Sequence, residues 1–248
     1  MFASFLTITL VFLIAKYKIQ SDFETRNGGN TGSLMVLFLT YFFVLVFVQI
    51  FENNALVLKK CGEERLIPVI QATIIPNVLI FSLIIVILKI FPGWKGPFSN
   101  TIGYLFSKGL NIKGSFDDLL IKGNTSDSLM KRIIEDKSLI INEISTSNFD
   151  EFLKNMDNFG ILSTSWKKLL EATGEDTNGE KLEDGPKGDS KTMVVAESLQ
   201  NLWKAVVLKD LIAEVMWYFL AGTLVISIIK SNIGDMDCVS SSTTSTTS

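Results

Sequence analysis

The 248-residue chain is 47% hydrophobic and 20% charged, with a formal net charge of −3. This weakly acidic balance argues against a broad surface for nucleic acid, so nucleic acid is not an expected partner. Histidine is absent, which excludes histidine-based acid–base catalysis, the Ser-His-Asp arrangement and histidine metal ligands.

The N-terminal segment, residues 1–15, is apolar and predicts an anchor helix. It lacks the basic start of a secretory signal, and Lys16, Tyr17 and Lys18 follow it in place of a small-residue cleavage site. We therefore favour a retained anchor over a cleaved signal. Residues 16–33 become rich in Gly, Asn, Ser and Thr and predict a loop.

Residues 34–51 form the clearest membrane-spanning segment, with no charge in 18 positions. A hydrocarbon core about 30 Å thick requires roughly 20 apolar residues of helix. A charged link is expected at 52–65, followed by a second long apolar segment at 66–91. Because proline removes a backbone hydrogen bond, Pro68 and Pro76 predict a kinked transmembrane helix in that segment. A broken helix that lines a substrate site is the alternative.

The last apolar segment, residues 211–229, predicts a transmembrane helix that continues a stalk helix from Met193. Glu214 lies one turn inside this span, where it is expected to pair or to reach the interface. A Ser/Thr-rich tail follows at 230–248.

The core of so short a chain cannot hide four long apolar segments. The sequence therefore predicts a mainly α, polytopic membrane protein with about four transmembrane helices.

One small, mostly helical polar domain, residues 92–210, is expected between the third and fourth spans. The spacing of its apolar residues predicts short helices at 115–121, 126–144, 149–159 and 165–172. Residues 174–190 are acidic and glycine-rich and predict a flexible loop.

The sequence carries no phosphate-binding loop, Cys/His cluster or hydrolase motif. No catalytic, cofactor-binding or metal-ligating residue is therefore predicted, and the chain is not expected to be an enzyme. Its two cysteines, Cys61 and Cys238, each lie beside a predicted membrane end and are expected to be free thiols.

The lysines and arginines near the membrane ends favour one orientation. With both termini on the non-cytosolic side, seven lie on the cytosolic side and four on the other. The cytosolic set is Lys16, Lys18, Arg26, Lys89, Lys95, Lys204 and Lys209, and the other set is Lys59, Lys60, Arg65 and Lys230. The polar domain is thus expected to face the cytosol.

The densest local signal is the segment 91–104, FPGWKGPFSNTIGY, which leaves the third span. Two prolines and three glycines in 14 residues predict that no helix continues through it. One interpretation is a rigid loop that docks a partner protein. The other is an aromatic belt at the membrane interface with a tight turn. The candidate docking residues are Trp94, Lys95, Gly96, Pro97, Phe98, Ser99, Asn100 and Tyr104.

The stretch from Trp94 to Tyr104, WKGPFSNTIGY, resembles a segment of membrane proteins from large nucleocytoplasmic DNA viruses of the chlorella-virus type. The resemblance covers about a dozen residues and implies a minor capsid protein in the virion's internal membrane, which derives from the host endoplasmic reticulum. It implies capsid or lattice proteins as partners beside the lipid bilayer and the chain's own copies, and it assigns no catalytic residue.

Two functions are therefore expected to compete. The first is a structural protein that anchors a bilayer to a protein lattice, through its polar domain. The second is a small oligomeric channel or transporter subunit, which would need polar residues along an interior path. The candidates for such a path are Gln49, Gln71, Asn77 and Glu214.

Overall fold

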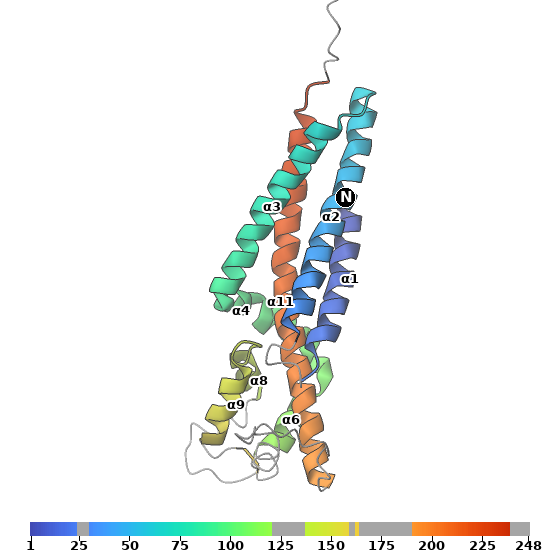
Figure 1. The fold of residues 1–248 in the computed structure, drawn as a ribbon. Helices are drawn as coiled ribbons and strands as arrows, with labels where there is room; N and C mark the ends of the chain where they lie inside the picture. Colours follow the sequence, from blue (N-terminus) through green and yellow to red (C-terminus); the bar gives the residue numbers. More distant parts are fainter. Residues whose placement is uncertain (24–29, 121–136, 159–161, 164–189, 239–248) are drawn as a thin grey trace, which may run out of the picture. The chain divides into compact units, whose positions relative to one another are not determined.

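The computed structural model describes residues 1–23, 30–120, 137–158, 162–163 and 190–238. These residues form a mainly α protein, as Figure 1 shows, and no strand occurs among them beyond an isolated bridge between Leu120 and Leu162. Four helices are long and apolar enough to cross a membrane. They are α1 (Phe2–Gln20), α2 (Thr31–Cys61), α3 (Leu66–Ile90) and α11 (Ser190–Gly234). The predicted mainly α, polytopic membrane fold is confirmed.

Three of the four long helices, α1, α2 and α11, extend beyond the apolar segments that predicted them. Helix α1 continues to Gln20, and α2 runs to Cys61 through most of the expected charged link. Gly62 follows with a positive φ of 72°, a conformation that glycine adopts without the steric penalty of a Cβ. Helix α3 runs through Pro76, and Pro68 lies in its first turn, where a backbone N–H has no helical partner to lose.

Short helical elements make up most of the remaining described chain. They are η1 (Pro92–Lys95), α4 (Gly96–Phe98), η2 (Ser99–Gly103), α5 (Tyr104–Ser107), η3 (Lys108–Leu110), α6 (Ile112–Leu119), α8 (Lys137–Glu143) and α9 (Phe149–Asn158). The predicted helix at 126–144 is described only from Lys137 onward. The predicted helix at 165–172, nearly all of the acidic loop 174–190 and the tail after Cys238 lie outside the described residues.

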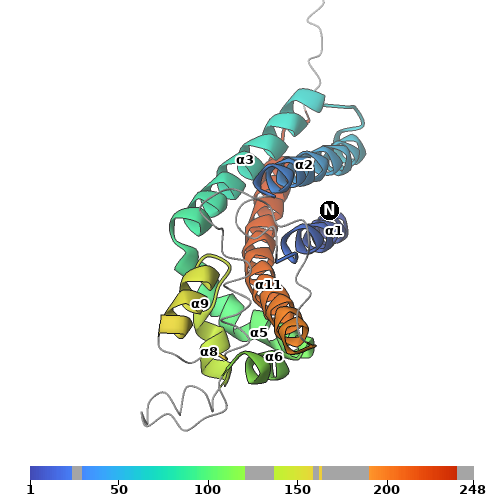
Figure 2. The ribbon, with the colours of Figure 1, turned by 60° about the horizontal axis from the view of Figure 1, so that its bottom comes forward.

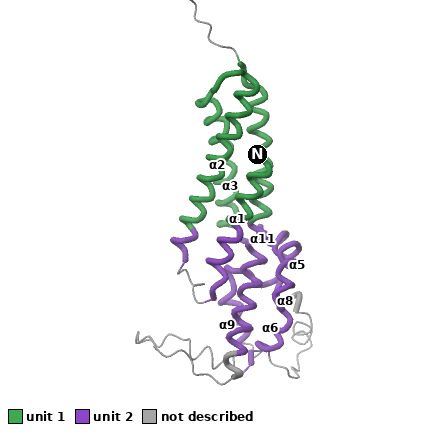
Figure 3. Tube along the Cα trace, turned by 90° about the vertical axis from the view of Figure 1, so that its right-hand side faces the viewer, with its two compact units in different colours: residues 1–12, 35–91, 215–248 green, residues 13–34, 92–214 purple. Residues whose placement is uncertain are grey.

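The chain divides into two compact units, coloured separately in Figure 3. Unit 1 comprises residues 1–12, 35–91 and 215–248, and unit 2 comprises residues 13–34 and 92–214. The predicted polar domain at 92–210 therefore includes a second piece of chain, the connection between α1 and α2. Three hydrogen bonds to α11 fix that piece. Trp203 donates to the carbonyl of Gln20, and Gln200 donates to the carbonyl of Ser21 and accepts from the backbone N–H of Phe23.

Unit 1 is built around a cluster of aromatic side chains contributed by its four helical segments. The rings of Phe12 and Tyr41 stack with their centroids 4.4 Å apart, and Tyr218 lies 6.3 Å from Tyr41. Helix α11 presents Gly222 where a Cβ would overlap the ring of Phe5. Small residues allow helices to approach closely in a membrane, where apolar burial alone gives little driving force for association.

Unit 2 has its own hydrophobic core, in which α6, α8 and α9 pack with the first part of α11 (Figure 2). Phe149 and Trp203 meet edge to face at its centre, with ring centroids 5.0 Å apart. Both α6 and α9 place apolar residues on one face, such as Phe116 and Leu119 in α6 and Leu153 and Met156 in α9. This amphipathic pattern is typical of helices that turn one face toward a hydrophobic core and the other toward water.

One disulfide joins two distant parts of unit 1, because Cys61 at the end of α2 is bonded to Cys238 after α11. The expectation of free thiols was wrong. Polar contacts join the ends of the same two helices. Lys60 donates to the carbonyls of Ile233, Gly234 and Met236, and Arg65 donates to that of Asp237. Two cysteines 177 residues apart carry no spacing signal, so their pairing follows only from the packing of α2 against α11.

The disulfide predicts the chemical state of the purified protein. Under non-reducing conditions the denatured full-length chain should take up no iodoacetamide, and it should take up two equivalents after reduction, as measured by intact mass. Cys61→Ser supplies the control, because it should expose one thiol without any reductant. Two equivalents bound before reduction would contradict the bond.

Candidate functional site

Three charged residues of α11 lie where this helix changes from a polar to an apolar sequence, and the candidate site is built on them. Lys209 and Asp210 directly precede the apolar stretch that starts at Leu211, and Glu214 follows one turn later. Such charges are costly at low dielectric unless they are paired or hydrogen-bonded. We call these residues and their polar partners the polar girdle. The partners are Lys16, Lys95, Ser99, Asn100, Thr146 and the carbonyls of Ile141 and Asn142.

Asp210 is the acceptor at the centre of the girdle, and only 6% of it is exposed. Its Oδ1 accepts from the hydroxyl of Ser99 at 3.0 Å. Its Oδ2 accepts from the backbone N–H of Thr146 at 2.7 Å and from the Thr146 hydroxyl at 2.8 Å. Hydrogen bonds to a charged group contribute about 1.5–3 kcal/mol each. One carboxylate therefore ties η2 and the turn before α9 to α11.

Lys209 is the donor of the girdle and is almost fully buried, with 1% exposed. Its ammonium donates to the carbonyl of Ile141 at 2.6 Å, to that of Asn142 at 3.5 Å and to the side-chain oxygen of Asn100 at 3.2 Å. Ile141 and Asn142 lie in the last turn of α8, where the carbonyls have no helical partners and the helix dipole favours a cation. Lys209 thus caps α8 from another helix.

Backbone packing completes the contact between η2 and α11. A Cβ built on Gly103 would lie 2.4 Å from the carbonyl oxygen of Lys209, too close for any side chain. Helix η2 is a five-residue π-helical segment, and π-helical turns are rare and are frequent at functional sites. Glycine at this position allows the wide turn to lie directly on α11.

Glu214 forms the ionic edge of the girdle. Its Oε1 lies 2.5 Å from the ammonium of Lys16, and its Oε2 lies 3.8 Å from that of Lys95. The expected pairing of Glu214 is present, with partners from α1 and η1. This cluster joins three separate segments of unit 2 at the residue where that unit ends.

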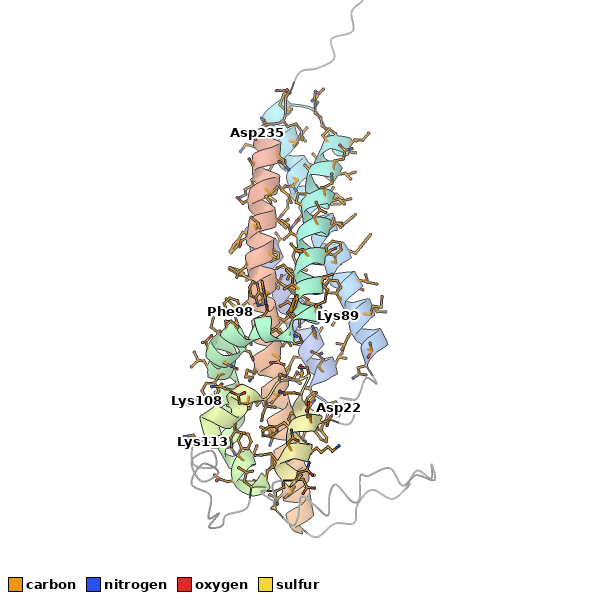
Figure 4. The ribbon with its side chains drawn as sticks, turned by 90° about the vertical axis from the view of Figure 1, so that its left-hand side faces the viewer. Asp22, Lys89, Phe98, Lys108, Lys113 and Asp235 are labelled. Carbon is orange, nitrogen blue, oxygen red and sulfur yellow. A yellow bond between two sulfur atoms is a disulfide. The ribbon has the colours of Figure 1, made fainter. Side chains whose placement is uncertain are left out.

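The structure divides the predicted docking residues into two groups. Ser99 and Asn100 bind Asp210 and Lys209, Lys95 contacts Glu214, and Tyr104 packs against the core of unit 2. Phe98 is half-buried (Figure 4). The group that faces outward consists of Trp94, Pro97 and, in part, Gly96, whose added Cβ would meet no atom within 4 Å.

The helix of the third span ends at Ile90, as predicted, but the prediction of a loop at 91–104 was wrong. From Pro92 to Leu110 the backbone forms consecutive helical turns of three different widths. Pro92 begins η1 and Pro97 lies in the first turn of α4, so neither ring removes a hydrogen bond from a helix interior. The structural roles of Lys209, Asp210 and Thr146 were also missed. Adjacent charges at the edge of a span were the available signal for the first two.

Two of the four polar residues proposed for a conduction path, Gln49 and Asn77, pair with each other inside unit 1. Asn77 donates to the side-chain oxygen of Gln49 at 2.7 Å, and both residues are at most 2% exposed. One helical turn away, Asn53 donates to the hydroxyl of Thr73 at 2.9 Å, a pair that the sequence did not indicate. These pairs join α2 to α3. Gln71 is exposed and does not belong to this ladder.

Over the described ranges no three Cys, Asp or Glu side chains lie close enough to hold a metal ion. In comparisons with known proteins, no family model, no curated protein and no solved structure matches this chain.

The close approach at Gly103 predicts a selective packing defect. Gly103→Ala should lower the free energy of unfolding by about 1–3 kcal/mol, because the new Cβ meets backbone atoms that cannot move independently. Thermal unfolding in detergent, followed by circular dichroism, measures the loss. Gly109→Ala is the matched control, since nothing lies within 4 Å of the Cβ it would add. Equal effects of both substitutions would contradict the packing of η2 on α11.

Proposed function

We propose that the chain is a structural membrane protein that anchors a bilayer to a protein lattice, with unit 2 as the part that the lattice binds. The polar girdle carries this proposal. It fixes short helices, a turn and the end of α1 to α11 directly beside the apolar stretch of that helix. Such an arrangement suits a rigid domain held at a membrane surface, because a load on any one segment passes to a membrane-spanning helix.

The arrangement of the amides in unit 1 favours an anchor over a channel. A conduction path requires polar groups that face a hydrated interior. Asn77 instead donates to Gln49, and Asn53 to Thr73, across the contact between α2 and α3. In a bilayer such bonds contribute about 0.6–2 kcal/mol each to helix association. Their chemistry therefore supports packing of the spans.

Within this proposal, the resemblance of WKGPFSNTIGY to a segment of viral membrane proteins favours a viral capsid as the lattice. The chain would be a minor capsid component that links the internal membrane of a large DNA virus to its icosahedral shell. That membrane would derive from the host endoplasmic reticulum, so its cytosolic leaflet would face the assembling shell. Unit 2 must then lie on the cytosolic side.

The disulfide supports this orientation independently of the charge count. Disulfides persist in oxidising compartments such as the lumen of the endoplasmic reticulum and are rare in the cytosol. Cys61 and Cys238 lie at the ends of α2 and α11, and the amino group of Met1 pairs with Glu52 in the last third of α2. Both termini are therefore proposed to lie on the lumenal side.

The anchoring role predicts that the full-length chain stays with the shell when lipid is removed. Virus particles that contain it should retain it in constant ratio to the major shell protein after detergent extraction, as measured by quantitative mass spectrometry. Asn77→Leu and Gln71→Leu should leave that ratio unchanged. Complete release with the lipid, together with ion flux through liposomes that contain the purified chain, would favour the channel.

The orientation can be measured through glycosylation during synthesis into microsomes. The natural acceptor Asn124-Thr125-Ser126 should remain unmodified, because unit 2 is proposed to face the cytosol. Thr244→Asn creates an acceptor with Ser245 and Thr246 in the C-terminal tail and should become modified. A mass shift that endoglycosidase reverses would report each site. Modification at Asn124 alone would contradict this orientation and support the opposite one.

A further inference from the structure

The turns from Pro92 to Ser107 carry large apolar side chains that are largely exposed. Trp94 is 48% exposed, Leu105 70% and Phe106 59%. The opposite side of the same turns is tightly packed, because Ser99, Gly103 and Ser107 are all buried. Ser99 and Gly103 contact α11, so the segment presents small residues to that helix and leaves large apolar side chains exposed. We call Trp94, Leu105 and Phe106 the apolar rim.

Two connections tie the segment that carries the rim to helices long and apolar enough to cross a membrane. Pro92 follows the end of α3 at Ile90 by two residues, which limits the separation of their Cα atoms to roughly 7 Å. The buried face lies on Lys209 and Asp210, which directly precede the apolar stretch of α11. The segment is thus tied to one spanning helix by the chain and to another by packing.

The residue types of the rim match the membrane interface. Tryptophan is enriched at the level of the lipid headgroups, and helices that lie in the interface plane combine aromatic or leucine residues with flanking lysines. Lys95 directly follows Trp94, and Lys108 lies two residues after Phe106. In Figure 4, Lys108 and Lys113 lie below Phe98. Burying apolar surface stabilises by about 25 cal/mol per Å², so exposure of three such side chains to water would be unfavourable.

We propose that residues 92–107 lie in the headgroup region of the bilayer, with Trp94, Leu105 and Phe106 inserted toward the acyl chains. The occupant of this apolar face is lipid. Ser99 and Gly103 connect it to α11, so the segment fixes the height at which unit 2 stands above the bilayer. The proposal depends on the spanning helices alone and is independent of any lattice partner.

Spin labels on the rim test the proposal. Leu105→Cys and, separately, Phe106→Cys are labelled with a nitroxide in the full-length oxidised protein, whose own cysteines are bonded to each other. After reconstitution into phosphatidylcholine vesicles, each label should collide several-fold more with oxygen than with a neutral nickel chelate, because oxygen partitions into lipid. The matched control is Lys113→Cys on the exposed side of α6, where the nickel chelate should dominate.

Each outcome at the rim decides the question. Preference for oxygen at both rim positions, with the reverse at the control, supports insertion. Preference for the nickel chelate at both rim positions would place the rim in water and overturn the proposal. Exclusion of both reagents would show coverage by protein, through self-association, and would also overturn it. Folding of each labelled variant is checked by its thermal midpoint, which should stay near that of the unsubstituted chain.

Discussion

The structure depends on one electrostatic constraint. Charged side chains next to an apolar, membrane-spanning stretch must be paired or hydrogen-bonded within the protein. Helix α11 places an ammonium and two carboxylates within six residues, at the start of its apolar stretch. Each of them recruits a different segment, since Lys209 binds the end of α8, Asp210 binds η2 and Thr146, and Glu214 binds α1 and η1. The pairing of these charges therefore organises most of unit 2.

Between α2 and α3, unit 1 pairs uncharged polar groups. Its buried amides and hydroxyls form a ladder between α2 and α3, while aromatic rings fill the space between α1, α2 and α11. Polar side chains inside a span must find partners within the protein, because lipid offers none. Unit 1 thus uses hydrogen bonds between uncharged groups where α2 meets α3. Unit 2 uses charged groups at the start of the apolar stretch of α11.

The sequence was a good guide wherever hydrophobicity alone decides the structure. All four spans were evident from long apolar segments, and Glu214 was correctly expected to pair. Predictions failed where long-range packing decides. The disulfide, the cap that Lys209 places on α8 and the contact of Gly103 with α11 each join residues 67 or more positions apart, for which no local pattern exists. Local rules also misled at 91–104, because prolines in first turns are compatible with helix.

The bond between Cys61 and Cys238 makes most of the molecule a covalent ring. The ring encloses α3, residues 92–214 of unit 2 and all of α11, so the enclosed part of unit 2 is attached to membrane-spanning helices at both of its ends. A force applied to unit 2 is then shared between its two connections to the membrane-spanning helices, which the disulfide joins covalently. A single backbone cut anywhere within the ring leaves every piece covalently attached. For the anchoring role proposed above, this closed path would provide mechanical redundancy at the cost of one oxidised bond.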